Sequence, residues 1–378
     1  MNVTRRGFLG ALGTGTAAAA VLPLPWASRT IASAEAAPAG RAASEIRLNS
    51  NENAYGPSHR VLQAIRDGIS NPHRYPDAAR REFEARAAES HRVSPDQVLI
   101  GCGSVEVLRV ATQAFTGPGR KLVMAAPTFE VIGQFAEAFG AQVVRVPLGR
   151  DFAHDLRGML SSLGSDAGLI YICNPNNPTA SLTPRKELDT FLSKLPTDTY
   201  VLIDEAYHHF AMESPDYVSF LDRPSTSDRV LVARTFSKVY GLAGMRLGYG
   251  IGSQQMIERM RKLATPENAN AAVLCGAMAA LDDRDGTRAS VQRNAADRAE
   301  FMHQAQRRKL SPIASHANFA MMDVGRPVAE VIEYFKKRGI RVGRPFPPLN
   351  THLRVSFGRP PEMVEFWRAW DRLPTVTG

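Results

Sequence analysis

The residue of this sequence that most clearly suggests a chemical role is a lysine that follows a short apolar run. Lys238 stands in the segment Arg234-Thr235-Phe236-Ser237-Lys238, and Arg246 follows eight residues later. A lysine just past a buried strand can act as a nucleophile that forms a Schiff base with an aldehyde cofactor. Partial burial near another cation would help its ammonium lose a proton. Taken alone, such a lysine is more often an ordinary surface residue. Whether Lys238 has a catalytic role therefore depends on which other reactive residues the sequence places near it.

A carboxylate stands at the end of a second apolar run. Asp204 directly follows Val201-Leu202-Ile203, and burying an acidic side chain there is costly unless it meets a cation. The pyridinium nitrogen of pyridoxal 5′-phosphate would be such a cation, and the pair would keep the cofactor ring an electron sink. A metal ligand or a structural aspartate is the alternative, which would be preferred if Asp204 stood without Lys238.

Two polar loops supply further groups. Asn174-Pro175-Asn176-Asn177-Pro178-Thr179 follows the apolar run 169–172, and a proline-braced turn there can present an amide to an oxygen on a bound ring. A plain Asn-Pro turn is the alternative. Gly101-Cys102-Gly103-Ser104 opens a helical pattern, whose free backbone N–H groups and dipole favour a phosphate. Each loop is weak evidence without Lys238 and Asp204.

The elements that must hold these groups follow from the hydrophobic pattern. Short runs rich in Val, Ile and Leu alternate with helical patterns, and the expected strands are 98–100, 122–125, 143–146, 169–172, 201–203 and 230–233. Such runs, separated by helices, indicate an α/β fold with a parallel sheet covered on both faces. In this architecture ligands gather at the carboxyl ends of the strands.

The sequence changes character after about residue 275. The expected elements of this part are, in order, a long charged helix at 288–309, a strand at 319–322, a helix at 328–337 and a strand at 353–357. They predict a smaller α+β domain at 276–375 beside a large domain at 73–275. Residues 45–72 are expected to pack with the small domain as an N-terminal arm.

Together these motifs resemble those of a fold-type I pyridoxal-phosphate-dependent aminotransferase of class I/II, and within it the histidinol-phosphate aminotransferase branch. The matching elements run from Leu48-Asn49-Ser50-Asn51-Glu52-Asn53 to Leu353-Arg354-Val355-Ser356 and occur in the family's order. The resemblance implies pyridoxal 5′-phosphate as cofactor. It also implies transfer of an amino group between an amino acid and a 2-oxo acid such as 2-oxoglutarate.

The resemblance implies roles for individual residues around the cofactor ring. Lys238 would form the Schiff base and shuttle the proton between substrate and cofactor. Asp204 would pair with the pyridinium nitrogen, and Asn177 and Tyr207 would hold the ring oxygen. Phe129 would stack on the ring, with an ordinary core phenylalanine as the alternative.

Further implied roles concern the cofactor phosphate and the assembly. The phosphate would be held by Gly103, Ser104, Thr235, Ser237 and Arg246, whose guanidinium fork suits a dianion. Tyr75, in Arg74-Tyr75-Pro76-Asp77, resembles a tyrosine that reaches the phosphate of the partner subunit. The active site would then require a homodimer.

Three residues are implied to bind substrate. Arg354 lies on an expected strand whose apolar neighbours point the other way, so it should face the cleft. It resembles the arginine that grips the substrate α-carboxylate by two parallel hydrogen bonds, with a surface ion pair as the alternative. Tyr55, in the arm, and Arg344, in the loop Arg341–Leu349, would contact the rest of the substrate.

Two departures from the family pattern bear on the substrate. Ala180 replaces the glycine that is usual after Asn-Pro-Thr. Histidinol-phosphate enzymes usually carry an arginine around Gly343 for the substrate phosphate; Arg344 or Arg341 could take that part, but the register is off. A histidinol-phosphate-like donor and an aromatic donor therefore both stay open.

Length and composition restrict the other possibilities. The 378 residues include 46 Lys+Arg and 37 Asp+Glu, for a formal charge of +9, and 44% are hydrophobic. This balance is that of a globular protein and excludes a wholly disordered chain. The basic clusters 307–309 and 336–338 lack interleaved aromatic residues, so solvated helix faces are favoured over nucleic-acid binding. His208-His209 has no second ligand pair at metal spacing, so no metal is assigned.

An export signal is expected at the N-terminus. Arg5-Arg6 precedes a weakly apolar run from Gly10 to Leu24, and Ser33–Ala36 offers small residues suited to cleavage. The Arg-Arg-Gly-Phe-Leu core resembles a twin-arginine signal, which predicts removal of residues 1–37 and a periplasmic or extracellular enzyme. A transmembrane anchor is the alternative, but the run is short and rich in glycine.

Two rival functions share the predicted cofactor site. A pyridoxal-phosphate decarboxylase or lyase would use the same residues and differ only in the substrate bond that is broken. A periplasmic binding protein could have kept the cofactor site without turnover, although the full set of Lys238, Asp204, Tyr207, Asn177 and Arg246 argues against it.

Overall fold

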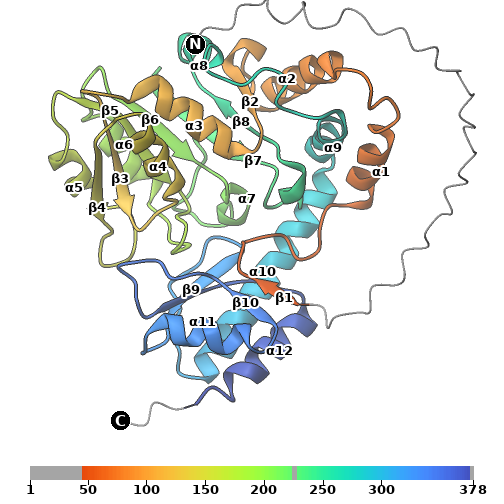
Figure 1. The fold of residues 1–378 in the computed structure, drawn as a ribbon, viewed down its shortest axis with the longest axis vertical. Coiled ribbons are helices and arrows are strands. Elements are labelled where there is room, and N and C mark those ends of the chain that lie inside the picture. Colours follow the sequence, from red (N-terminus) through yellow and green to blue (C-terminus); the bar gives the residue numbers. More distant parts are fainter. Residues whose placement is uncertain (1–44, 224–227, 375–378) are drawn as a thin grey trace, which may run out of the picture. The chain divides into compact units, whose positions relative to one another are not determined.

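The computed structural model describes residues 45–223 and 228–374. Its centre is a seven-stranded sheet (Figure 1) in the order β2-β8-β7-β6-β5-β3-β4. The strands are β2 (Val98–Gly101), β3 (Lys121–Ala126), β4 (Val143–Pro147), β5 (Ala167–Cys173), β6 (Tyr200–Asp204), β7 (Val230–Thr235) and β8 (Gly248–Ile251). Only β8 runs antiparallel to its neighbours. The predicted α/β fold with a mostly parallel sheet is confirmed.

Strand β8 was not predicted, because its sequence Gly-Tyr-Gly-Ile lacks an apolar run. Both glycines are required by close packing. A Cβ on Gly248 would lie 2.3 Å from the backbone nitrogen of Ser104, and one on Gly250 would lie 2.8 Å from Val107. The helix that begins at Ser104 therefore sits directly on this strand.

Helices cover both faces of the sheet. One face packs against α3 (Ser104–Phe115), α4 (Val131–Ala138) and α8 (Gln254–Arg261). The other packs against α2 (Asp77–His91), α5 (Leu156–Ser161), α6 (Arg185–Leu192) and α9 (Ala271–Asp282). Along β5 the alternation is strict: Leu169 and Tyr171 belong to the first core, while Ile170 and Ile172 belong to the second. Burial on both faces explains why the strands are nearly continuous apolar runs.

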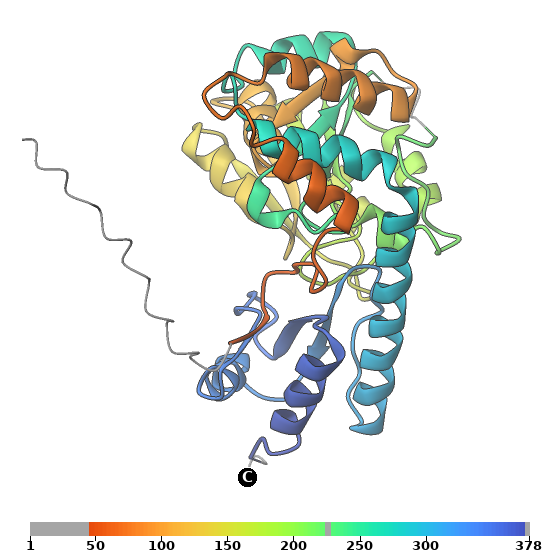
Figure 2. The same ribbon diagram turned by 90° about the vertical axis from the view of Figure 1, so that its right-hand side faces the viewer.

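The C-terminal lobe has its own core. β9 (Phe319–Asp323) pairs antiparallel with β11 (His352–Ser356), and α10 (Arg284–Arg307), α11 (Val328–Lys336) and α12 (Pro360–Trp370) pack around them. Figure 2 shows α10 running from the level of the large lobe down along the small one. Buried aromatic side chains, among them Phe301, Phe335 and Phe366, fill the space between these helices.

The N-terminal arm divides between the two lobes, which corrects the expectation that residues 45–72 pack with the small domain. β1 (Ile46–Leu48) pairs in parallel with β10 (Ile340–Val342) of the small lobe. Helix α1 (His59–Asp67) packs instead against α9, with Val61 and Ile65 in the core of the large lobe. The packing of α1 on the large lobe can be explained from the sequence. The apolar side chains of α1 must be buried against another surface, and α9 provides a surface made of small residues.

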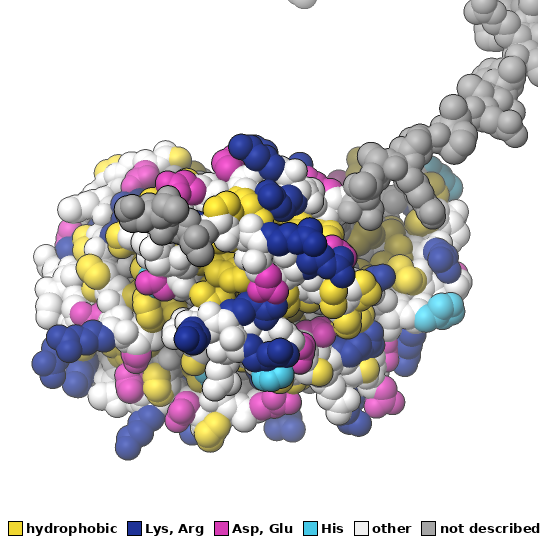
Figure 3. Space-filling view, turned by 90° about the horizontal axis from the view of Figure 1, so that it is seen from below, with side chains coloured by type: hydrophobic (Ala, Val, Ile, Leu, Met, Phe, Trp, Pro, Cys, Tyr) yellow, Lys and Arg dark blue, Asp and Glu magenta, His cyan; other side chains and the backbone are white. Residues whose placement is uncertain are grey.

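The two basic clusters lie at the small-lobe end of the described structure, which Figure 3 shows from below. Lysine and arginine side chains are spread over this face with acidic side chains between them. Arg308 pairs with Asp371 at 2.6 Å, and Lys336 with Glu333 at 3.3 Å. In residues 45–223 and 228–374, no helix combines the length and apolar character needed to cross a membrane. The predicted signal at 1–37 lies outside the described residues.

Candidate active site

A cavity of about 730 Å³ lies at the carboxyl ends of the central strands. Cys173, Asp204 and Thr235 are the last residues of β5, β6 and β7, and all three line it. The walls also come from the arm, at 49–52, and from the small lobe. The cavity therefore lies at the strand ends, where ligands are expected in this architecture.

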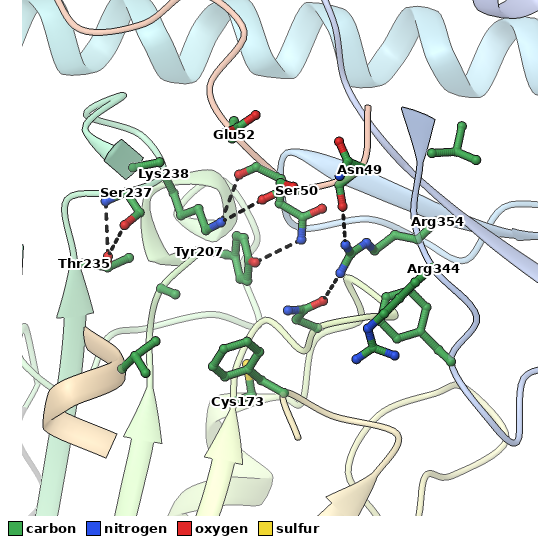
Figure 4. A pocket seen from close by; sticks show the side chains of 18 of the residues that line it. Asn49, Ser50, Glu52, Cys173, Tyr207, Thr235, Ser237, Lys238, Arg344 and Arg354 are labelled. Atoms are coloured by element: carbon green, nitrogen blue, oxygen red, sulfur yellow. Dashed lines mark hydrogen bonds between the residues drawn. The ribbon is translucent and has the colours of Figure 1, made fainter. Parts of the chain in front are cut away.

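Lys238 projects into this cavity from the loop after β7 (Figure 4). Its Nζ donates hydrogen bonds to the carbonyl oxygens of Ser50 at 3.3 Å and Asn51 at 3.0 Å. Burial, reinforced by the nearby Arg354 guanidinium, lowers the pKa of Lys238 to about 8, although Glu52 opposes the change. A substantial fraction of the amine is thus neutral near pH 8, as nucleophilic attack and proton abstraction require.

Asp204 is a buried acid that forms no ion pair with another residue in the described part of the chain. It is 3% exposed; Tyr171 donates its hydroxyl hydrogen to Oδ2 at 2.8 Å, and the backbone N–H of Ala206 donates to Oδ1 at 3.1 Å. Burial still raises the pKa of Asp204 to about 6, despite these two hydrogen bonds. A cationic ring nitrogen in the cavity would offset that burial.

The predicted phosphate site is a concave group of donors at the start of α3. Gly103 has φ 74° and serves as N-cap of α3 without a side-chain hydrogen bond, so the first N–H groups of the helix stay available. A Cβ on Gly103 would lie 2.2 Å from a guanidinium nitrogen of Arg246, so only glycine permits this approach. Thr235 donates to Ser237 Oγ at 3.0 Å, and Arg246 lies 3.4 Å from the same atom.

These donors fit pyridoxal 5′-phosphate in their chemistry. A helix N-terminus, two hydroxyls and a guanidinium suit a phosphate dianion, and the buried acid of β6 suits a ring cation. Phe129 lines the cavity as well, where a ring could stack on it. The residues present would therefore hold the cofactor with its phosphate at α3 and its ring nitrogen at Asp204.

Asn177 and Tyr207 line the same cavity, as predicted for the groups that hold the ring oxygen. Asn177 Oδ1 accepts a hydrogen bond from Arg354 Nη1 at 2.6 Å. Tyr207, 3% exposed, accepts one at its hydroxyl oxygen from Asn51 Nδ2 at 3.1 Å. Burial raises the pKa of Tyr207, so its hydroxyl keeps its proton at neutral pH.

Arg354 faces the cavity from β11, as the alternation of that strand predicts. Its Nη2 donates to the carbonyl oxygen of Asn49 at 2.6 Å, while its buried Nε has no hydrogen-bond partner among residues 45–223 and 228–374. Burial lowers the pKa of Arg354 to about 10, so the side chain remains a cation at neutral pH. An unpartnered buried donor on a cation is strong grounds for an anionic ligand.

Arg344 lines the cavity but is already paired. Its Nη2 lies 2.6 Å from Glu130 Oε1, and both side chains are half-exposed. Its guanidinium carbon also lies 4.3 Å from the centre of the Phe346 ring. The predicted substrate residue therefore sits at the rim of the site with its charge balanced.

The structure does not bring Tyr55 or Tyr75 into this cavity. The Tyr55 hydroxyl donates to Asp297 of α10 at 3.2 Å, and Tyr55 lines a different cavity, so its predicted contact with substrate is not formed by this cavity within one chain. Tyr75 is 75% exposed and lines a separate cavity together with Cys102 and Glu106. Within one chain it contributes nothing to the site.

Sequence reasoning missed the part played by the arm. Asn49, Ser50, Asn51 and Glu52 all line the cavity, although only the family motif had marked them. The available signal was the run of polar residues that directly follows Leu48 in the sequence. Phe346 and Glu130 were also missed, because nothing in a loop sequence shows which residue it will meet.

The described ranges contain no group of three or more His, Cys, Asp or Glu side chains placed to hold a metal ion. His208 and His209 have other partners. The ring nitrogens of His208 and His209 lie 3.1 Å and 3.2 Å from the hydroxyls of Tyr217 and Tyr240.

Several known proteins resemble this chain in sequence and in architecture. The family model described as aminotransferase class I and II matches residues 43–368. A histidinol-phosphate aminotransferase of Symbiobacterium thermophilum is 36% identical over 86% of this chain and 89% of its own length. Histidinol-phosphate aminotransferase 2 of Methylococcus capsulatus is also 36% identical, over 87% and 90%. A crystal structure of the Sinorhizobium meliloti histidinol-phosphate aminotransferase with pyridoxal 5′-phosphate superimposes with a TM-score of 0.80 at 28% identity, covering 86% of this chain and 89% of that one.

Proposed function

We propose a specific reaction for this chain, which belongs to the aminotransferase class I and II family. It is a pyridoxal 5′-phosphate-dependent transaminase that moves an amino group between an amino acid and a 2-oxo acid. The observation that supports this reaction is the arrangement of Lys238, Asp204 and Arg354 around one cavity. We also propose the amino donor, the homodimer and the cellular location of the enzyme.

Each of these residues has a defined task. When bound, the cofactor supplies an aldehyde that links to amines and a ring that withdraws electrons from the substrate Cα. With the cofactor bound, Lys238 Nζ would remove the proton from the substrate Cα and hold it as an ammonium hydrogen. The carbonyl oxygens of Ser50 and Asn51 are placed to accept hydrogen bonds from that ammonium. Asp204 would stabilise a positive charge on the ring nitrogen.

Arg354 binds the α-carboxylate of the substrate and orients its Cα. Its Nε is the unpartnered buried donor, and its two terminal nitrogens are already held by Asn177 and Asn49. The carboxylate therefore meets a guanidinium whose position is fixed in advance, which lowers the entropy cost of binding.

We favour an aromatic amino acid over histidinol phosphate as donor. The lining of the cavity includes the apolar residues Phe129, Ile332, Val342, Pro345 and Phe346, which suit a substrate with a large apolar side chain. Arg344 and Arg341, the two candidates for a substrate phosphate, have their charges balanced by Glu130 and Glu45. The names of the relatives nevertheless make histidinol phosphate the reference donor for any test.

A donor screen with 2-oxoglutarate tests the proposal. We expect aromatic L-amino acids to yield glutamate and the matching 2-oxo acids, with higher kcat/KM than histidinol phosphate. Faster turnover of histidinol phosphate would overturn the choice of donor. Release of carbon dioxide and an amine would instead support the decarboxylase alternative, and bound cofactor without any turnover would support the binding protein.

Replacing Arg354 with lysine should lower kcat/KM for L-phenylalanine by about 10- to 100-fold, because the charge stays but the second hydrogen bond is lost. Phenethylamine, which lacks the carboxylate, is the matched control and should react at a nearly unchanged low rate. Steady-state kinetics on both substrates make the comparison. An equal loss for the two would show that Arg354 does not bind the carboxylate.

The enzyme is proposed to work as a homodimer. Tyr75 and Ile69 have exposed side chains, and both line the same surface cavity as Cys102 and Val105. Val105 also lines the active-site cavity, so a partner docked here would bring its Tyr75 close to the phosphate donors. Sedimentation should give twice the chain mass. Mixed assemblies of Tyr75→Phe and Lys238→Ala chains should recover activity that neither variant has alone.

Export by the twin-arginine route is also proposed, from Arg5-Arg6 and the short run that follows. An enzyme exported in folded form could carry its cofactor with it. Changing both arginines to lysine should abolish the processed form outside the cytoplasm, as followed by immunoblotting of cell fractions. Unchanged export of that variant would refute this route.

A further inference from the structure

Asn51 occupies an unusual position on the arm. It has φ 53°, in the left-handed region, and is 2% exposed. Its contacts reach the large lobe at Tyr207 and Lys238 and the small lobe at Ser356. Strain of this kind in a non-glycine residue persists only where the surroundings hold it.

The hydrogen bonds of Asn51 form a chain with a defined direction. The backbone N–H of Asn51 donates to Ser356 Oγ at 2.8 Å. Ser356 in turn donates its single hydroxyl hydrogen to Asn51 Oδ1 at 3.1 Å. With Oδ1 occupied as acceptor, the amide turns Nδ2 toward Tyr207, and it donates to the phenol oxygen at 3.1 Å.

The direction of this chain fixes what Tyr207 can do. A hydroxyl has one hydrogen to donate and lone pairs to accept with. Because Asn51 supplies the donor in their contact, the hydrogen of Tyr207 remains for a group inside the cavity. The Tyr207 side chain lies next to Lys238 in the cavity (Figure 4), with Nζ of Lys238 5.6 Å from the centre of the phenol ring.

We propose that Asn51 is a positioning residue, which acts through Tyr207: it keeps the phenol hydrogen directed into the cavity, toward the ring oxygen of the cofactor. The inference rests on the proposed function, because it assigns Tyr207 to that oxygen. Ser356 belongs to the same device, since it sets the orientation of the Asn51 amide. The arm therefore helps to set the acidity of the lysine linkage as well as closing the site.

The readout is the pH dependence of the absorbance of the lysine-bound cofactor in the complete holoenzyme. A hydrogen bond donated by Tyr207 would stabilise the ring oxygen of the cofactor after the proton that it shares with the lysine linkage has been lost. Removing this hydrogen bond should therefore raise the pKa of the absorbance change by about one unit. The charged groups that face Lys238, namely Glu52, Asp204, Arg246 and Arg354, stay the same in every variant.

A double-mutant cycle separates positioning from a merely structural role. Asn51→Gly keeps the left-handed backbone and its carbonyl contacts, so only the amide is lost. We expect it to raise the pKa of the absorbance change in the wild-type background. In the Tyr207→Phe background, which already lacks the hydroxyl, the same substitution should add nothing.

The Ser356→Ala variant is a second test of the same inference, and it can be used if Asn51→Gly fails to fold. It should move the pKa in the same direction by less, and again only when Tyr207 is present. Full, additive shifts in the Tyr207→Phe background, or no shift from either variant, would overturn the inference. If the wild-type enzyme formed no lysine-bound band or transferred no amino group, the proposed function would fail instead, so the two failures are distinct.

Discussion

Replacing Lys238 with alanine is expected to remove the absorbance band of the lysine-bound cofactor and to lower transamination by about 10⁴-fold. The physical reason is that one amine performs two tasks. In the proposed reaction it would hold the cofactor, and its pKa of about 8 would let it act as a base near pH 8. Absorbance spectra of the purified variant with added cofactor, together with single-turnover kinetics, measure the two losses.

Lys262→Ala is the matched control, because that side chain is exposed and pairs only with Glu258 at 3.3 Å. It should leave both band and rate unchanged. Added methylamine should restore part of the rate of Lys238→Ala by supplying the missing base. A band that persisted in Lys238→Ala would mean that another residue holds the cofactor.

The second large effect is expected at Asp204, where activity and stability should move in opposite directions. Asp204→Asn should lower kcat by about 10²- to 10³-fold, because a neutral amide cannot stabilise the cationic ring nitrogen. The amide can still accept from Ala206 and donate to Tyr171, so the local hydrogen bonds survive in number. Steady-state kinetics with saturating cofactor give the loss.

The same substitution should stabilise the protein without cofactor. Burial raises the pKa of Asp204 to about 6, above its unfolded value near 4, so the folded state binds the proton more tightly. Ionised Asp204 therefore costs about 3 kcal/mol of unfolding free energy above pH 6, and the cost vanishes as the pH falls below 4. Asp204→Asn should recover most of this at pH 8 and little at pH 4.

Denaturant unfolding at the two pH values, with and without cofactor, tests this sign. With cofactor bound, the order should reverse, since only the carboxylate gains from the ring cation. Asp285→Asn, at an exposed position in the first turn of α10, should lower the free energy of unfolding by less than about 1 kcal/mol, and equally with and without cofactor. Stabilisation of Asp204→Asn at pH 4 as large as at pH 8 would contradict the electrostatic explanation.

Residues at strand ends could be predicted from the sequence, because the location of a strand end depends on local hydrophobic pattern. Lys238, Asp204 and Asn177 all follow buried runs, and the parallel sheet brings such ends together. Arg354 could be oriented for a similar reason, since alternation along β11 sends it opposite to Leu353 and Val355.

Contacts between distant segments could not be predicted in this way. Tyr55 and Asn51 lie four residues apart in the same arm, yet one meets α10 and the other meets the catalytic lysine. Which polar residue of a loop reaches a site depends on backbone turns set by tertiary contacts. Ala180 is a related case: the structure gives it φ 60°, the conformation that favours the glycine its family carries there.

The pairing of β1 with β10 has a consequence for the time at which the enzyme becomes active. Ile46 lies opposite Ile340, so the first strand to leave the ribosome must wait until almost the whole chain has been synthesised. The segment that receives Lys238 follows directly after this strand. The cavity is also lined by Val342 and Arg354, so its walls are complete only after these residues have been synthesised. Fragments truncated before residue 340 would lack both Arg354 and the strand that pairs with β1.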